Sequence, residues 1–115
     1  MLRAAAVLLV CAALAGCTES NPKSDAELGL NPQQAAGRRV YDSRCLACHS
    51  AYSRSGKNGP SLQGIFKKPY FPSGTPANDE RMKDVVVMGR PMMPGFRNQL
   101  TEREMNELMA YLHTL

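Results

Sequence analysis

Tryptophan is absent from the 115 residues, and histidine occurs only twice, as His49 and His113. Cys45 and Cys48 form a Cys-x-x-Cys pair, which in many proteins is half of a zinc site. Such a site needs a second pair of ligands, and one further histidine does not supply it. The chain also lacks the alternating strand and helix pattern that surrounds a redox-active Cys-x-x-Cys dithiol. These absences argue against both common roles of the pair.

Charge of either sign is modest, with 14 basic and 10 acidic residues and a net charge of +4. The basic residues are scattered rather than gathered in one stripe, so we expect no nucleic-acid partner. Long apolar runs are missing too, because the run at 4–13 is too short to cross a bilayer as a helix. It follows the positively charged Arg3 and is typical of the apolar part of a signal peptide.

The N-terminal region continues with Leu-Ala-Gly-Cys at 14–17, which resembles the lipobox of bacterial lipoproteins. The resemblance implies cleavage before Cys17 and lipidation of that cysteine, whereas an ordinary signal peptide would leave Cys17 incidental. Residues 18–30 are polar and without periodicity, as in a flexible linker; packing of part of this stretch on the domain is the alternative. We therefore predict a signal peptide at 1–16, a lipidated tether at 17–30 and a folded domain at 31–115. The expected location is the periplasmic or another extracytoplasmic face of a membrane.

Residues 45–49 read Cys-Leu-Ala-Cys-His, the attachment signature of c-type haem. Each thiol adds across one haem vinyl group to give a thioether, and cysteines about one helical turn apart can reach both vinyl groups. The next residue, His49, then lies beneath the iron, where a ring nitrogen can bind as the proximal ligand. The pattern predicts one covalently attached haem c, held by Cys45 and Cys48.

Helices are expected on both sides of this motif, because capping residues precede stretches with apolar residues at helical spacing. The first and third expected helices lie near the two ends of the folded domain. The expected elements are a helix from Pro32 towards Cys45 capped by Asn31, a helix over 80–88 capped by Asn78 or Asp79 and ended by Gly89, and a helix from 102 to the C-terminus with a capping box of Thr101 and Glu104.

Several residues of the loop after the motif are placed to support a haem. The carbonyl of Pro60 can accept a hydrogen bond from the free ring N–H of His49, which would fix the ring. Leu62 would then wall one haem edge, although a turn beside a core leucine explains both residues as well. Tyr70 and Phe71 lie in a proline-rich loop and would fold over a haem edge or a propionate; ordinary core packing is the alternative.

The methionines are the candidates for a ligand on the other face of the iron. Met92 and Met93 lie in a Pro-Met-Met-Pro loop at 91–94, where neither helix nor strand packing readily explains a methionine. A thioether there can supply the sixth ligand, and the residues alone leave both candidates open. His113, near the end of the last helix, is interpreted as a solvated side chain close to the negative end of the helix dipole.

Taken together, these residues resemble the small monohaem class I cytochromes c over residues 32–115. The shared motifs are Gly-x-x-x-Tyr before Cys-x-x-Cys-His, then Gly-Pro-x-Leu, Met-Pro-Gly-Phe and a last helix ending Leu-Met-Ala-Tyr-Leu. The resemblance implies an all-α class I cytochrome c fold, with helices wrapped around one covalently attached haem. It also implies that the first and last helices cross near Gly37 and Tyr111.

The same resemblance assigns roles within the site. It implies His49 as the proximal ligand, the carbonyl of Pro60 as its hydrogen-bond partner, and Leu62 as part of the haem wall. The family's distal ligand is the methionine directly before proline, so Met93 is favoured over Met92. No tryptophan is present to hold a propionate; Tyr70, Arg90 or another donor would have to do so.

The expected function is one-electron transfer between a donor and an acceptor, both of them redox proteins, at a membrane reached through the lipid on Cys17. Ligation by His49 and Met93 would saturate the iron and leave no open position for a substrate. A haem-based catalyst or ligand sensor with a labile Met93 is the alternative from another functional class. A relay subunit docked on a larger exported dehydrogenase or reductase is a third possibility.

Overall fold

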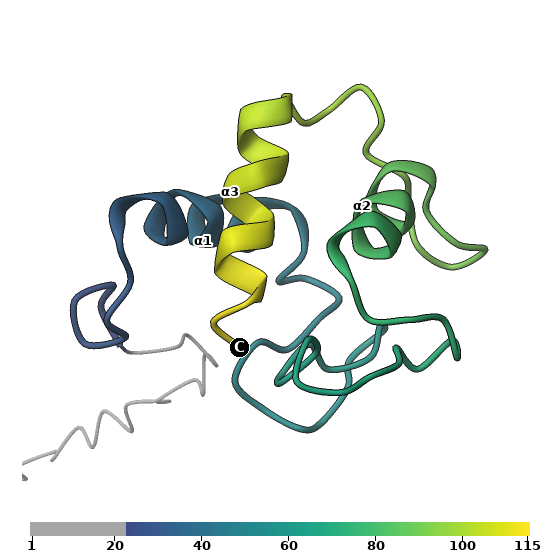
Figure 1. Ribbon diagram of the computed structural model, residues 1–115, viewed down its shortest axis with the longest axis horizontal. Helices are drawn as coiled ribbons and strands as arrows, with labels where there is room; N and C mark the ends of the chain where they lie inside the picture. Colours follow the sequence, from purple (N-terminus) through teal and green to yellow (C-terminus); the bar gives the residue numbers. More distant parts are fainter. Residues whose placement is uncertain (1–22) are drawn as a thin grey trace, which may run out of the picture.

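The computed structural model describes residues 23–115, so the predicted signal peptide at 1–16 and the predicted lipidation of Cys17 lie outside the described residues. Within residues 23–115 three helices follow one another: α1 (Pro32–Arg44), α2 (Asp79–Met88) and α3 (Glu102–Leu112) (Figure 1). Between residues 23 and 115 there is no strand, only the two isolated bridges Tyr70–Pro76 and Arg90–Met93. The predicted all-α class is confirmed. None of the helices in this range is long and apolar enough to cross a membrane.

Polar side chains fix the start of α1. The Asn31 side chain accepts a hydrogen bond from the Gln34 amide at 2.8 Å, and the Gln34 side chain accepts one from the Asn31 amide at 2.9 Å. This reciprocal capping box satisfies amides that a helix start would otherwise leave unpaired. Pro32 lies in the first turn, where its missing N–H costs nothing. The predicted start of the first helix is confirmed.

Caps also set the bounds of the other two helices. Asn78, rather than Asp79, caps α2 by accepting from the Arg81 amide at 2.9 Å. Gly89 ends α2 with a φ of 72°, a backbone conformation that costs glycine little. Thr101 and Glu104 form the predicted capping box of α3, with bonds of 3.2 and 2.8 Å. α3 ends at Leu112, slightly short of the predicted end at the C-terminus.

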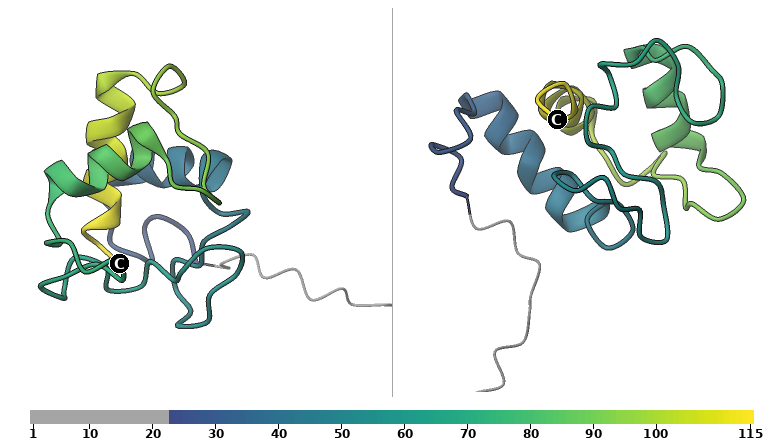
Figure 2. Two further views of the ribbon diagram at one scale, coloured as in Figure 1. Left: turned by 90° about the vertical axis from the view of Figure 1, so that its right-hand side faces the viewer. Right: turned by 90° about the horizontal axis from the view of Figure 1, so that it is seen from below.

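The first and last helices cross, as predicted (Figure 1). Gly37 provides the close approach, because a Cβ on it would overlap the backbone carbonyl of Glu107 and would lie 2.8 Å from Cβ of Tyr111. The rings of Tyr41 and Tyr111 lie beside this point, with centroids 5.4 Å apart. The view from below shows α3 between α1 and α2 (Figure 2). α3 therefore contributes to the core on both of its sides.

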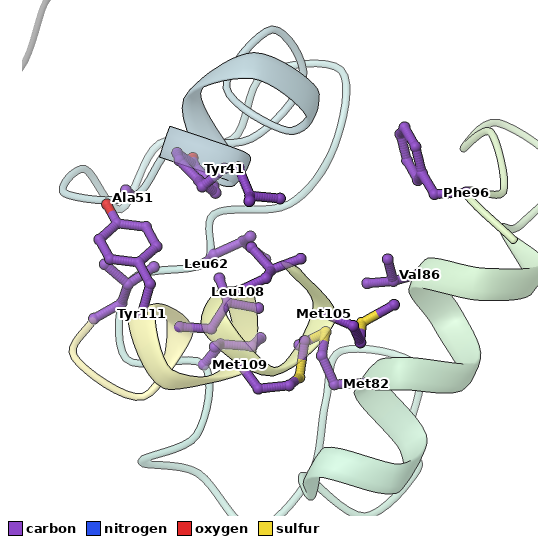
Figure 3. Packing of buried hydrophobic residues seen from close by; sticks show 14 of the residues in the cluster. Tyr41, Ala51, Leu62, Met82, Val86, Phe96, Met105, Leu108, Met109 and Tyr111 are labelled. Carbon is purple, nitrogen blue, oxygen red and sulfur yellow. The ribbon is translucent and has the colours of Figure 1, made fainter. Parts of the chain in front are cut away.

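The hydrophobic core gathers around α3. Figure 3 shows Leu108 and Met109 of α3 between Tyr41 of α1 on one side and the α2 side chains on the other. Met105, Leu108, Met109 and Leu112 recur at three- and four-residue spacing and share one face of α3. Tyr111 widens this buried face toward α1, where it meets Gly37 and Tyr41. The buried apolar residues are Val40, Tyr41, Ala51, Leu62, Ile65, Phe71, Met82, Val86, Phe96, Met105, Leu108, Met109, Tyr111, Leu112 and Leu115.

The end of the predicted tether is folded against the domain. Arg38 of α1 donates to the Asp25 carboxylate at 2.7 Å and to the Lys23 carbonyl at 2.9 Å. Leu30 packs against the hydrophobic core. Residues 23–30, predicted as part of a flexible linker, are therefore held on α1, because a charged pair and an apolar contact outweigh their polar composition.

Candidate functional site

The Cys-x-x-Cys-His motif lies in a turn that continues α1. Cys45 is the C-cap of the helix, and the amides of Cys48 and His49 both donate to the Cys45 carbonyl, at 3.0 and 2.9 Å. Both cysteines are partly buried free thiols. Burial, with a smaller contribution from Cys48, raises the pKa of Cys45 to about 11. The Cys45 thiol is therefore neutral at pH 7.

Hydrogen bonds hold His49 at both its ring and its backbone. Its Nδ1 lies 2.8 Å from the carbonyl oxygen of Pro60. A carbonyl can only accept, so Nδ1 carries the proton and Nε2 keeps its lone pair for another partner. The Tyr41 hydroxyl donates to the His49 carbonyl at 2.6 Å. The ring orientation and the backbone position of His49 are thus both fixed.

Gly59 lies against the flat imidazole of His49. A Cβ on Gly59 would be 2.5 Å from Cε1 and 2.8 Å from Nδ1 of this ring. The amide of Gly59 also donates to the Cys48 carbonyl at 2.8 Å, which ties the loop to the motif. Only a residue without a side chain leaves the ring in this position.

Gly59→Ala is expected to displace the His49 ring and to weaken its hydrogen bond to Pro60. The expected loss is about 1–3 kcal/mol in the free energy of unfolding of the protein, as for other overpacked sites, together with a shift in reduction potential. Gly74→Ala is the control, because a Cβ there meets nothing within 4 Å and introduces only the strain of a φ of 83°. Denaturant unfolding and redox titration of both variants measure these changes. Equal changes in stability and potential in the two variants would contradict a specific role of Gly59 beside the His49 ring.

A cavity of about 280 Å³ opens beside the motif. Its volume is just below the range typical of ligand pockets, about 300–1,000 Å³. Sulfur and imidazole groups from separate segments meet at its wall, and most other lining side chains are apolar. The residues that line it are Cys45, Cys48, His49, Asn58, Gly59, Pro60, Leu62, Ile65, Phe71, Pro72, Ser73, Met82, Val85, Val86, Arg90, Met92, Met93, Pro94, Leu108 and Leu112.

The loop after α2 brings the two candidate methionines to the cavity with different exposure. Arg90 and Met93 exchange backbone hydrogen bonds of 3.0 and 2.9 Å across a tight turn. Met93 is partly buried and packs against the core, whereas Met92, at the tip of this turn, is 95% exposed. Gly89 lets the turn close, because a Cβ there would lie 2.5 Å from the Met93 carbonyl. The turn thus favours Met93 as the sulfur that faces inward.

Of the remaining predicted site residues, some line the cavity and one faces away from it. Leu62 and Phe71 are buried and line the cavity. Tyr70 is 60% exposed and is not among the lining residues. Consecutive residues in extended backbone point to opposite faces, and Tyr70 forms an isolated bridge with Pro76; Phe71 therefore points in and Tyr70 out. Arg90 lines the cavity and is the better placed of the two donors considered for a propionate.

Two contacts around His49 were not predicted from the sequence. The hydroxyl of Tyr41 holds the His49 carbonyl, and Gly59 lies against the ring. The sequence carried a signal for each, since Tyr41 belongs to the Gly-x-x-x-Tyr motif and Gly59 to Gly-Pro-x-Leu. Neither residue was assigned a contact with His49; Tyr41 was expected only to meet the last helix.

Comparison with known families gives a match for residues 32–112 to the family described as "Cytochrome C oxidase, cbb3-type, subunit III". The chain belongs to this cytochrome c family. Membership implies haem-based electron transfer and agrees with the all-α, class I cytochrome c fold predicted from the sequence. The matched range begins at the first residue of α1 and ends at the last residue of α3.

Individual relatives include a cytochrome of similar length and two much longer dehydrogenases. Cytochrome c6 of Picosynechococcus is 26% identical over 81 residues, which are 68% of this chain and 69% of the relative. Dihydro-heme d1 dehydrogenase of Pseudomonas aeruginosa is 33% identical over 82 residues, 70% of this chain. One of the subunits of nicotinate dehydrogenase from Pseudomonas putida is 30% identical over 100 residues, 79% of this chain. This cytochrome spans only 15% and 8% of the lengths of those two dehydrogenase relatives.

The donor set of this cytochrome fits a haem better than a bare metal ion. Within residues 23–115 no group of three or more histidine, cysteine, aspartate or glutamate side chains is arranged to hold a metal. The iron of a haem brings its own four nitrogen ligands and asks the protein for at most two more. The cavity offers His49 and a methionine for these, two thiols for attachment, and apolar walls. The residues present therefore fit a haem c.

Proposed function

We propose that the chain carries one haem c, attached through thioether bonds at Cys45 and Cys48, and acts as a one-electron carrier. His49 and Met93 are the proposed axial ligands. The observation that supports this most strongly is a cavity lined by all four of these residues, which come from two loops more than 40 positions apart. The walls between them are apolar, as a buried porphyrin requires.

The residues of the chain prepare the site in several ways. Cys45 and Cys48 would hold the group, because the S–H bond of each can add across a carbon–carbon double bond so that no atom leaves. The hydrogen bond from His49 Nδ1 to Pro60, at 2.8 Å, orients the ring and increases the basicity of Nε2. Leu62 and Phe71 keep water from the cavity wall. When bound, haem supplies an iron that changes its charge by one electron.

The ligand pair determines which kind of haem protein this is. A thioether from Met93 raises the reduction potential, and apolar surroundings work in the same direction by disfavouring the extra charge of the oxidised iron. With His49 and Met93 both bound, no position remains for peroxide or a small gas. This proposal therefore favours electron transfer over catalysis or sensing.

Cys45→Ser and Cys48→Ser are expected to leave one thioether each, and the double variant none. The measurement is the intact mass of the matured protein after acid denaturation. The wild type should retain the mass of one haem, while the double variant should lose all of it to solvent extraction. Ser43→Ala is the control, because Ser43 is an exposed residue of α1 outside the cavity lining. A wild type that loses its haem on denaturation would contradict covalent attachment.

We also propose that lipid on Cys17 holds this carrier at the extracytoplasmic face of a membrane, where it exchanges electrons with protein donors and acceptors. The lipobox-like residues 14–17 support the anchor. The two dehydrogenase relatives, in which the matched segment is a small part, support the alternative of a relay subunit docked on a larger oxidoreductase. Size-exclusion chromatography of detergent extracts separates the two, because a relay subunit elutes with its enzyme and a free carrier elutes alone.

A further inference from the structure

Residues 23–30 form a compact turn immediately before α1. Ser24 and Glu27 bond to each other in both directions: the Ser24 amide donates to the Glu27 carboxylate at 2.7 Å, and the Glu27 amide donates to the Ser24 hydroxyl at 3.2 Å. The Leu30 amide donates to the Asp25 carbonyl at 2.9 Å. The bonds from Ser24 lower the pKa of Glu27, so its carboxylate stays charged at neutral pH. The turn therefore has a defined internal structure.

Arg38 of α1 fastens this turn to the domain. One guanidinium nitrogen lies 2.7 Å from the Asp25 carboxylate and another lies 2.9 Å from the Lys23 carbonyl. The side chain is only 13% exposed, so its charge is partly removed from water, which strengthens both bonds. Asp42, one turn further along α1, lies 3.9 Å from the same guanidinium. We call these contacts of Arg38 with Lys23 and Asp25 the Arg38 clamp.

The Arg38 clamp changes the length of chain available as a tether. With the folded domain beginning at 31, fourteen residue steps would separate it from Cys17, a span of about 50 Å when extended. With the clamp closed, only the six steps from Cys17 to Lys23 remain, a span of at most about 20 Å. The domain itself is about 30 Å across for its size. Its farthest point is then about 50 Å from the lipid.

We propose that the Arg38 clamp keeps the tether short and commits this carrier to a redox protein bound to the same membrane. The inference rests on the lipid anchor at Cys17 that the proposed function includes. A short tether concentrates the carrier in a thin layer above the bilayer, where a partner in that bilayer is met at high effective concentration. A partner fixed to an opposing membrane farther away would instead require a long tether.

The clamp itself is tested by Arg38→Gln, with Arg39→Gln as the matched control. Arg39 is the next residue of α1 and is exposed. The measurement is hydrogen–deuterium exchange of the haem-loaded, full-length protein. The amides of Leu28 and Leu30 should exchange about tenfold faster or more in Arg38→Gln, and at the wild-type rate in Arg39→Gln. Unchanged exchange in Arg38→Gln would overturn the clamp.

The partner class is tested by lengthening the tether with ten Gly and Ser residues inserted between positions 22 and 23. The lipidated wild type and the insertion variant are made in the native host, and the rate of haem reduction by its isolated membranes is measured. Effective concentration falls as about the −3/2 power of tether length, so the longer tether should slow reduction about fourfold. An unchanged or faster rate would overturn the assignment of a partner in the same membrane.

The state of each sample is established before these rates are compared. An optical spectrum and an intact mass report the haem and the lipid separately. A protein without lipid on Cys17 would overturn both the anchor and this inference. A protein with lipid and haem, but with no effect of the insertion, would overturn this inference and leave the proposed carrier function standing.

Discussion

Met93→Ala is expected to lower the reduction potential of the mature protein by roughly 0.2 V, a fraction of the ~0.8 V range that axial ligands control. It should also abolish the methionine-to-iron charge-transfer band of the oxidised form. The reason is that the thioether stabilises the reduced iron, and water or a weaker donor replaces it in the variant. The open position should then bind carbon monoxide. Redox titration and optical spectra of the oxidised and reduced protein measure all three effects.

Met92→Ala is the matched control for this prediction. The two residues are neighbours of the same type, but Met92 is 95% exposed while Met93 packs against the core. The control should therefore keep the band and stay within experimental error of the wild-type potential. Loss of the band in Met92→Ala with retention in Met93→Ala would reverse the ligand assignment. It would require the turn closed by Arg90 and Met93 to rearrange when haem binds.

Gly37→Ala is expected to destabilise the domain by about 3 kcal/mol or more, at the upper end of the cost of overpacking. Alanine has a higher helix propensity than glycine, so the loss of stability must come from the crossing of α1 and α3. A methyl group would overlap the Glu107 carbonyl and crowd Tyr111, and two packed helices have to separate to admit it. Denaturant unfolding of the haem-loaded protein, followed by far-UV circular dichroism, measures the change.

Gly29→Ala makes the same substitution where there is room. A Cβ at this position meets nothing within 4 Å, although its φ is 67°. Only the backbone strain, about 1 kcal/mol, should be lost from the free energy of unfolding. If Gly37→Ala cost no more than Gly29→Ala, the close approach of the two helices would not be what Gly37 provides.

Local chemistry made much of the fold predictable. Caps such as Asn31 and Thr101 accept hydrogen bonds from amides two or three residues away, so the local sequence is enough to predict them. The structure confirms both caps. The role of Gly37 was predictable for another reason: a glycine within a helical stretch indicates the close approach of another helix. The choice of Met93 depended on the family resemblance; the difference in exposure between Met92 and Met93 became visible only in the structure.

Contacts between distant segments were not predictable from the sequence. Arg38 reaches Asp25 thirteen positions away, and no local pattern marks that pair, so residues 23–30 were interpreted as a linker. His113 was expected to be merely solvated, but its Nε2 lies 2.6 Å from the Asp79 carboxylate and its ring stacks on Phe66 at 4.0 Å. The outward orientation of Tyr70 likewise depends on its pairing with Pro76.

The most direct test of a closed, six-coordinate carrier is the optical spectrum of the matured wild-type protein, oxidised and reduced, with carbon monoxide added to the reduced form. We predict a methionine-to-iron charge-transfer band in the oxidised spectrum and no change on addition of carbon monoxide, because the proposed ligands His49 and Met93 would leave no position for it. A spectrum without the band, and rapid binding of carbon monoxide, would contradict the account and favour a haem catalyst or sensor.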